Sequence, residues 1–142
     1  MKNFRLLIII TVLTSTVFAA CKKEETLDRS NTAISLVGKW VMTASYQDVH
    51  SGPYWENIEA GDEPWVMEFT SDGKHSTTQF PDLVAYKISA PGELMLQSKT
   101  DGEWHPFRYF ATKSGELIIH PSGGKYACYD GYGCLIKFKR AI

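Results

Sequence analysis

The sequence predicts an all-β protein, an eight-stranded antiparallel up-and-down β-barrel. From Leu36 onward, apolar and polar residues alternate with a period of two, which is typical of half-buried antiparallel strands. Turn-forming dipeptides recur about every ten residues, and short strands at that spacing form a sandwich or a barrel. No segment shows a sustained helical repeat of apolar residues. These three observations favour strands throughout the folded part of the chain.

The first two strands each contain a tryptophan near their start. They are expected over residues 38–46, GKWVMTASY, and residues 65–70, WVMEFT. Successive side chains of a strand point to opposite faces, so every second residue faces the barrel interior. The predicted inward residues are Trp40, Met42, Ala44, Tyr46, Trp65, Met67 and Phe69.

Six further strands are expected, at residues 74–80, 83–89, 93–98, 105–112, 116–120 and 134–141. The turns between them fall at Asp72-Gly73, Pro81-Asp82, Pro91-Gly92, Asp101-Gly102 and Ser114-Gly115. The predicted inward residues are Val84, Tyr86, Ile88, Leu94, Leu96, Leu117, Ile119, Ile136 and Phe138. The connection QDVHSGPYWENIEAGDE, between the first two strands, is expected to be a long loop with room for one helical turn.

The N-terminus has the pattern of a secretory signal. Lys2 and Arg5 precede an apolar run over residues 6–18, and the small residues Ala19 and Ala20 follow it. A helix of about 13 residues reaches about 20 Å, short of the roughly 30 Å of a bilayer core. A cleaved signal peptide over residues 1–20 is therefore favoured over a membrane-spanning helix.

The end of this signal, VFAAC, resembles a bacterial lipobox, although Phe18 replaces the usual leucine. The resemblance implies cleavage before Cys21 and acylation of that cysteine, which anchors the chain in the outer membrane. CKKEE is also similar to signals that export lipoproteins to the cell surface, so the periplasmic and surface sides both stay open. The expected division is a signal peptide at 1–20, a lipidated cysteine and flexible tether at 21–35, and a folded domain at 36–142. The alternative is a plain secreted protein with a free Cys21.

Two cysteines remain if lipid occupies Cys21. Cys128 and Cys134 are separated by five residues in CYDGYGC, and the two glycines let the chain double back. A disulfide is expected in an oxidising compartment. The alternatives are a redox pair or a metal pair. A redox motif more typically has the spacing C-x-x-C, and further ligands at metal spacing are lacking.

The folded region resembles the lipocalin-like lipoproteins of gram-negative bacteria. The resemblance covers residues 36–142 and rests on Leu36, Gly38, Trp40, Phe69, Asp72, Gly73, Cys128, Cys134, Lys137, Phe138 and Arg140. It implies a lipocalin-like barrel. The chain is shorter than the classical lipocalins and lacks their Thr-Asp-Tyr motif, so the resemblance implies no ligand.

The two ends of such a barrel differ in the side chains they carry. Arg140 shares the inward parity of Phe138, and in similar lipocalins an arginine covers the first-strand tryptophan, here Trp40. The alternative for Arg140 is a solvated terminal charge. The opposite end is expected to form an aromatic mouth for a ligand or partner, built from Tyr54, Trp55, Tyr126, Tyr129 and Tyr132. The alternative for Tyr54 and Trp55 is a lid over the core.

Binding is favoured over catalysis. The histidines at 50, 75, 105 and 120 have no metal-site spacing, and each is expected at the surface. The chain contains no common catalytic motif, so we expect no enzyme activity, cofactor or metal. The formal net charge of −1 gives no electrostatic footprint for nucleic acid. We expect a monomer that binds a small apolar or amphipathic ligand. The alternative is a protein-interaction module with a filled core, such as a periplasmic hydrolase inhibitor.

Overall fold

A computed structural model describes residues 29, 31–49, 52–59, 63–126 and 134–142. All eight predicted strands are present, and a ninth, β2, occupies part of the predicted long loop. The described residues contain no helix with the length and hydropathy of a membrane span. The elements are β1 (Gly38–Val49), β2 (Gly52–Asn57), β3 (Val66–Phe69), β4 (His75–Thr77), β5 (Leu83–Ala90), β6 (Glu93–Ser98), β7 (Trp104–Ala111), β8 (Leu117–Pro121), the 3-10 turn η2 (Gly124–Tyr126) and β9 (Ile136–Arg140).

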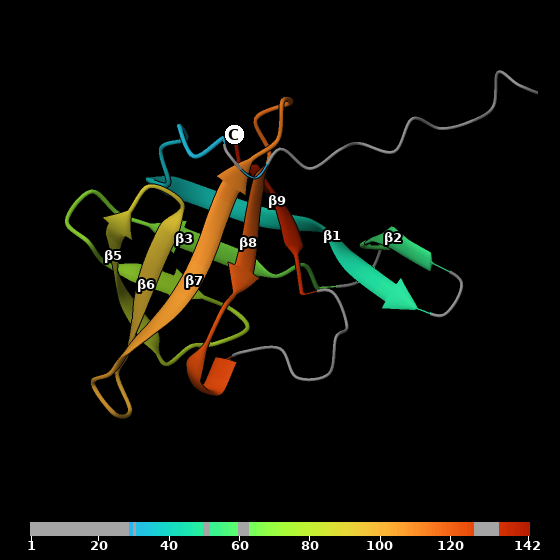
Figure 1. Ribbon diagram of the computed structural model, residues 1–142. Coiled ribbons are helices and arrows are strands. Elements are labelled where there is room, and N and C mark those ends of the chain that lie inside the picture. Colours follow the sequence, from blue (N-terminus) through green and yellow to red (C-terminus); the bar gives the residue numbers. More distant parts are fainter. Residues whose placement is uncertain (1–28, 30, 50–51, 60–62, 127–133) are drawn as a thin grey trace, which may run out of the picture.

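The strands form one antiparallel sheet that curls into a nearly closed barrel (Figure 1). Their order is β4-β3-β1-β9-β8-β7-β6-β5, so β1 and β9, the first and last strands in the sequence, are neighbours. The two outer strands approach each other where Lys74 pairs with Ala85 and where the Tyr86 N–H donates to the Gly73 carbonyl at 2.8 Å. The predicted all-β antiparallel barrel is therefore confirmed.

Large apolar side chains fill the barrel. Trp40, Phe69 and Phe138 are each at most 1 % exposed, although they come from strands far apart in the sequence. Most of the other core residues are residues of β3, β6, β8 and β9 that were predicted to face inward. The buried core consists of Leu36, Trp40, Met67, Phe69, Leu83, Leu94, Leu96, Phe107, Tyr109, Leu117, Ile119, Ile136 and Phe138.

A β-bulge in β1 changes which residues face the core. Met42 lies opposite the inward Phe138, but Ala44 lies opposite the outward Lys137, because the register shifts between them. One extra residue in a strand moves all later side chains to the other face. Ala44 is buried, at 2 % exposure, but on the side of β1 that faces away from Phe138, and the prediction that Tyr46 points into the barrel interior is wrong. Tyr46 belongs instead to a second cluster, made of Phe110, Ile118, Leu135, Tyr46 and Trp55.

The predicted long loop is partly a hairpin. β2 pairs with the distal half of β1 and, among the described strands, with no other. Figure 1 shows this β1–β2 hairpin extending away from the barrel. The prediction of a helical turn within WENIEAGDEP is wrong for the first three residues, because Trp55, Glu56 and Asn57 are in β2.

The inward set of β5 also differs from the prediction. Ile88 is 50 % exposed, whereas Leu83 is buried in the core. Register shifts near both ends of the β5–β6 pairing, between Leu83 and Ala85 and between Ile88 and Ala90, break the expected alternation.

The folded region begins earlier than the predicted boundary at residue 36. The Ala111 N–H donates to the Asn31 carbonyl at 2.7 Å, and Ile34 packs against the core. Residues 31–35 therefore contact the barrel and are not part of a free tether. The signal peptide and Cys21 lie outside the described residues.

Candidate ligand-binding site

The end of the barrel where β1 begins is closed by Trp40 and Arg140. These residues lie opposite each other in the β1–β9 ladder, and the Arg140 guanidinium lies 4.9 Å from the Trp40 ring centroid. Trp40 Nε1–H donates to the Leu36 carbonyl at 2.7 Å, and an Arg140 N–H donates to the Ser35 carbonyl at 2.7 Å. The N-terminal segment thus folds across this end, and the predicted stacking of Arg140 on Trp40 is present.

Replacing Arg140 with alanine should lower the free energy of unfolding by about 1–2 kcal/mol. The change removes a cation–π contact and one charged hydrogen bond. Urea denaturation of wild type and variant measures the difference. The matched control is Lys139→Ala, which removes a neighbouring, largely exposed cation. Equal and negligible effects of the two changes would show that the stacking does not stabilise the barrel.

The opposite end of the barrel is open. It contains a cavity of about 530 Å³, within the range usual for small-molecule sites. The ends of β1, β8 and β9 that lie away from Arg140 form one wall, and the chain around β3 and β4 forms the other. The apolar side chains in its lining are Met42, Ile58, Pro64, Trp65, Phe80, Pro121, Tyr126, Leu135 and Ile136.

Three aromatic rings define the shape of this cavity. Phe80 lies between Trp65 and Tyr126, with ring centroids 5.2 Å and 4.9 Å away and both contacts edge-on. Trp65 also contacts Phe138 in the core, at 6.0 Å. The Trp65 indole N–H donates to the Thr77 hydroxyl, and the Tyr126 hydroxyl donates to Asp82. The polar tips of both rings therefore have protein partners, and the rings offer mainly apolar surface to a ligand.

A charged network holds Tyr126 at this end. Lys125 Nζ lies 3.3 Å from Asp82 and 3.0 Å from Asp101, and it also donates to the Ser98 hydroxyl. The hydrogen bond from Tyr126, with those from Lys125 and Ser98, lowers the pKa of Asp82. Hydrogen bonding to Asp101 is the largest cause that raises the pKa of Lys125. Both groups are therefore ionised at neutral pH, and their attraction fixes η2 and its tyrosine beside the cavity.

Only one of the described mouth candidates lines the cavity, and it is Tyr126. Trp55 lies on the opposite face of the sheet, where it packs on Tyr46 at 5.3 Å and where Lys137 Nζ lies 4.3 Å from its ring centroid. Tyr54 is 46 % exposed on β2. Neither residue belongs to the cavity lining. Trp55 instead packs over the second apolar cluster, formed by Phe110, Ile118 and Leu135, and so covers that part of the core. Tyr129 and Tyr132 lie outside the described residues.

The positions of Trp65 and Phe80 in the cavity lining differ from the predicted mouth. Trp65 was expected as an ordinary inward core residue, and Phe80 precedes a Pro-Asp turn at the end of a predicted strand. Trp65 is the first inward residue of its predicted strand, and a residue in that position lies near an end of the barrel. This position could have indicated that Trp65 lies at the cavity. Cys134 is also in the cavity lining, whereas Cys128 lies outside the described residues, so the predicted disulfide stays a prediction.

The expectation that every histidine lies at the surface is wrong for His75 and His105, which are each 5 % exposed. His75 Nδ1 lies 3.1 Å from the Glu68 carbonyl, and its ring packs on Phe69 at 4.6 Å. Burial lowers the pKa of His75 to about 4, so this imidazole is neutral in the folded protein at pH 7. Nε2 of both histidines is buried without a hydrogen-bond partner.

No protein-family model, curated protein or solved structure matches this chain. The fold and the cavity therefore carry the functional argument.

Proposed function

We propose that this protein is a cell-envelope lipoprotein whose lipocalin-like barrel binds a small apolar or amphipathic ligand at its open end. The observation that carries the proposal is the cavity of about 530 Å³ opposite the end that Arg140 closes. The rest of the described interior is filled by the core, so a ligand would sit at the mouth and not deep inside the barrel.

The lining favours a ligand with an apolar body. Trp65, Phe80 and Tyr126 present ring surface, and Met42 and Ile136 add aliphatic surface between them. The polar residues in the lining include Glu63 and Gln79, both of which are exposed. A ligand with a flat or aliphatic body and a hydrogen-bond-donating or cationic end directed toward solvent fits this distribution.

The described chain enters the barrel at the end opposite the cavity. The chain enters the barrel beside Arg140, through the Ser35 carbonyl. The closed end would then face the membrane and the cavity would face away from it. This orientation suits capture of a ligand from outside better than extraction of lipid from the anchoring bilayer.

Binding of a neutral apolar fluorophore, N-phenyl-1-naphthylamine, tests the proposal. Ser45 lines the cavity, so Ser45→Phe places a ring inside it and should weaken fluorophore binding by at least about tenfold, or about 1.4 kcal/mol. The matched control is Ser89→Phe on the exposed part of β5, which should bind like wild type. Equal binding by all three proteins would contradict the proposal, and so would no saturable binding by wild type.

The predicted bridge between Cys128 and Cys134 would close a short loop beside this cavity. The intact mass of the native protein should rise by two hydrogens on reduction, and digestion should release both cysteines in one crosslinked peptide. Loss of the bridge should lower the free energy of unfolding by about 2–3 kcal/mol, as expected for a loop of this length. Alkylation of both thiols in the native, unreduced protein would contradict the pairing.

The β1–β2 hairpin supports the alternative, a protein-interaction module. It extends from the barrel (Figure 1), and it carries the exposed Tyr54 beside Glu56. Tyrosine is enriched at protein interfaces, and an extended hairpin can enter a cleft of a partner. Fluorophore binding that Ser45→Phe weakens would favour the ligand cavity over this alternative.

A further inference from the structure

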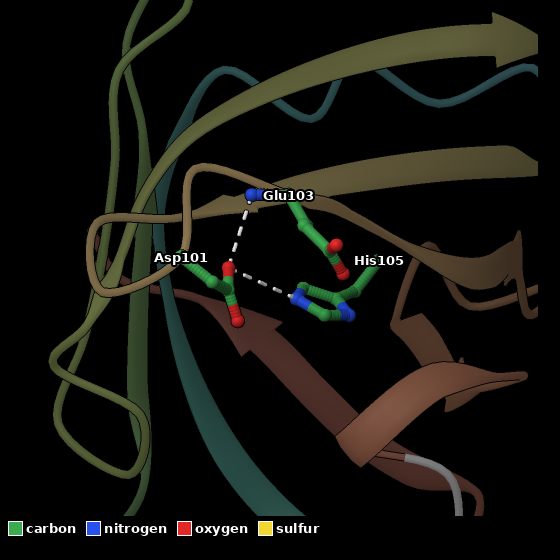
Figure 2. Close-up of side chains that lie close together, drawn as sticks. All are labelled: Asp101, Glu103 and His105. Atoms are coloured by element: carbon green, nitrogen blue, oxygen red, sulfur yellow. Dashed lines mark hydrogen bonds and ion pairs between the residues drawn. The ribbon is translucent and has the colours of Figure 1, made fainter.

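The turn between β6 and β7 brings two carboxylates to a buried histidine. Asp101, Glu103 and His105 alternate along the chain, and Figure 2 shows the side chains of Asp101 and Glu103 directed toward the His105 ring. One ligand atom of each residue lies within 4.8 Å of the other two. The carboxylates are exposed and the imidazole is buried, so the cluster opens to solvent on one side only.

His105 Nε2 is the atom that singles out this cluster. It is buried and has no hydrogen-bond partner, and Asp101 Oδ1 lies 3.7 Å away, beyond hydrogen-bond distance. A buried polar atom without a partner is unusual in a folded protein, and a bound ion is one of the recognised reasons for it.

The surroundings of His105 hold its ring in this orientation. Tyr126 contacts the ring edge-on at 4.8 Å. Gly124 closes the other approach, because a Cβ atom there would lie 2.7 Å from Nδ1. Gly124 also has a φ of +69°, which glycine adopts without strain. The ring therefore has little freedom to turn Nε2 away from the carboxylates.

Asp101 is held as firmly as the histidine. Its Oδ1 accepts the Glu103 backbone N–H at 3.0 Å, and its Oδ2 lies 3.0 Å from Lys125 Nζ. Lys125 thus pairs with Oδ2, whereas Oδ1 is the oxygen that lies 3.7 Å from Nε2. Partners of this kind orient metal-binding carboxylates. Asp82, Asp101 and Glu103 together carry three negative charges against the one positive charge of Lys125, which favours a cation.

We propose that Asp101, Glu103 and His105 bind a divalent transition-metal ion, with Zn²⁺ as the representative, through the two carboxylates and Nε2. An ion bonded at about 2.0–2.2 Å to each atom requires ligand atoms no more than about 4.4 Å apart. Rotation of the exposed Glu103 side chain closes the remaining gap. One imidazole and two carboxylates suit zinc or manganese better than calcium, which takes six to eight oxygen ligands. Three protein ligands leave a coordination position for water.

Calorimetric titration of the full chain with Zn²⁺ in detergent tests the site. Asp101→Asn, Glu103→Gln and His105→Phe should each weaken the site by at least about tenfold. His105→Phe keeps an aromatic ring against Tyr126. Asp101 and Glu103 are exposed, so their variants should fold and test the site even if His105→Phe does not fold. The controls Glu93→Gln and His120→Asn alter another acid and another histidine and should bind like wild type. Ca²⁺ should bind far more weakly than Zn²⁺.

Nitrogen-15 NMR of the imidazoles gives a second readout, because Zn²⁺ should shift the Nε2 resonance of His105 and leave that of His75 unchanged. Zn²⁺ binding that persists in all three ligand variants, for example through cysteine thiolates, would overturn the proposal. An unmoved His105 resonance or the absence of saturable binding would overturn it as well. The ligand cavity does not depend on this outcome, because Asp101, Glu103 and His105 are not in its lining.

Discussion

The Cys21→Ala variant should move almost entirely from the membrane fraction to the soluble fraction of the cell envelope. The lipobox-like VFAAC predicts that Cys21 carries the lipid, and two or more acyl chains are needed for stable anchoring. The variant would lose all of them at once. Cell fractionation followed by an alkaline wash of the membranes measures the redistribution.

The matched control is Ser30→Ala, a change in the same predicted tether that leaves the cysteine intact and should leave the protein in the membrane fraction. If the Cys21→Ala variant still sediments with washed membranes, the lipid-anchor hypothesis is wrong. A full-length precursor in the membrane, retaining residues 1–20, would instead show that the apolar run is itself an anchor.

Acidification from pH 6.5 to pH 4 should lower the free energy of unfolding, with His75 contributing up to about 3 kcal/mol. Burial lowers the pKa of His75 from 6.5 to about 4 in the folded protein. Between these values the unfolded chain binds a proton that the folded protein does not bind, so stability falls as pH falls. The contribution is fully present above pH 6.5 and is lost progressively toward pH 4.

Urea denaturation at a series of pH values measures this slope. His75→Gln removes the titrating ring and should flatten the curve between pH 6.5 and pH 4. His120→Gln is the control. Its pKa is also lowered, mainly by burial and then by Arg29 and Arg108, but it is less buried, so most of the slope should remain. An unchanged slope in His75→Gln would show that other groups cause the acid sensitivity.

The strands could be predicted from the sequence because alternation and turn residues are local signals. Trp40, Phe69 and Phe138 are in the core as their parity predicts, and Asp72-Gly73 forms a turn that brings β4 back onto β3. β2 could not be recognised, because PYWEN has no polar-apolar alternation and its pairing depends on the distal half of β1. Local pattern therefore predicts strands better than it predicts their partners.

The site was less predictable because it depends on a bulge and on the register of distant strands. The shift between Met42 and Ala44 turns Tyr46 outward, and Trp55 follows because it pairs with Tyr46. The aromatic mouth predicted around Trp55 is thus replaced by rings from Trp65 and Phe80. Among the described candidates, only Tyr126 was placed correctly at the cavity.

The burial of His75 and His105 could not be predicted from sequence patterns either. His75 follows a turn in a short strand, and nothing in GKHST distinguishes a buried ring from an exposed one. His105 belongs to HPFRYFAT, where both parities are apolar and the inward face cannot be chosen. Its closeness to Asp101 and Glu103 depends on the tight turn between β6 and β7, and the spacing of the four histidines carries no information about that turn.

Methyl NMR of the full chain, titrated with N-phenyl-1-naphthylamine, tests the central claim that the open end is a ligand site. The structure predicts saturable shifts and intermolecular nuclear Overhauser effects at Met42, Ile58 and Ile136, which line the cavity. Leu36, beside Trp40 at the closed end, should show neither effect. Overhauser effects confined to the β1–β2 hairpin, or none at the three cavity methyl residues when the fluorophore is bound, would contradict the account.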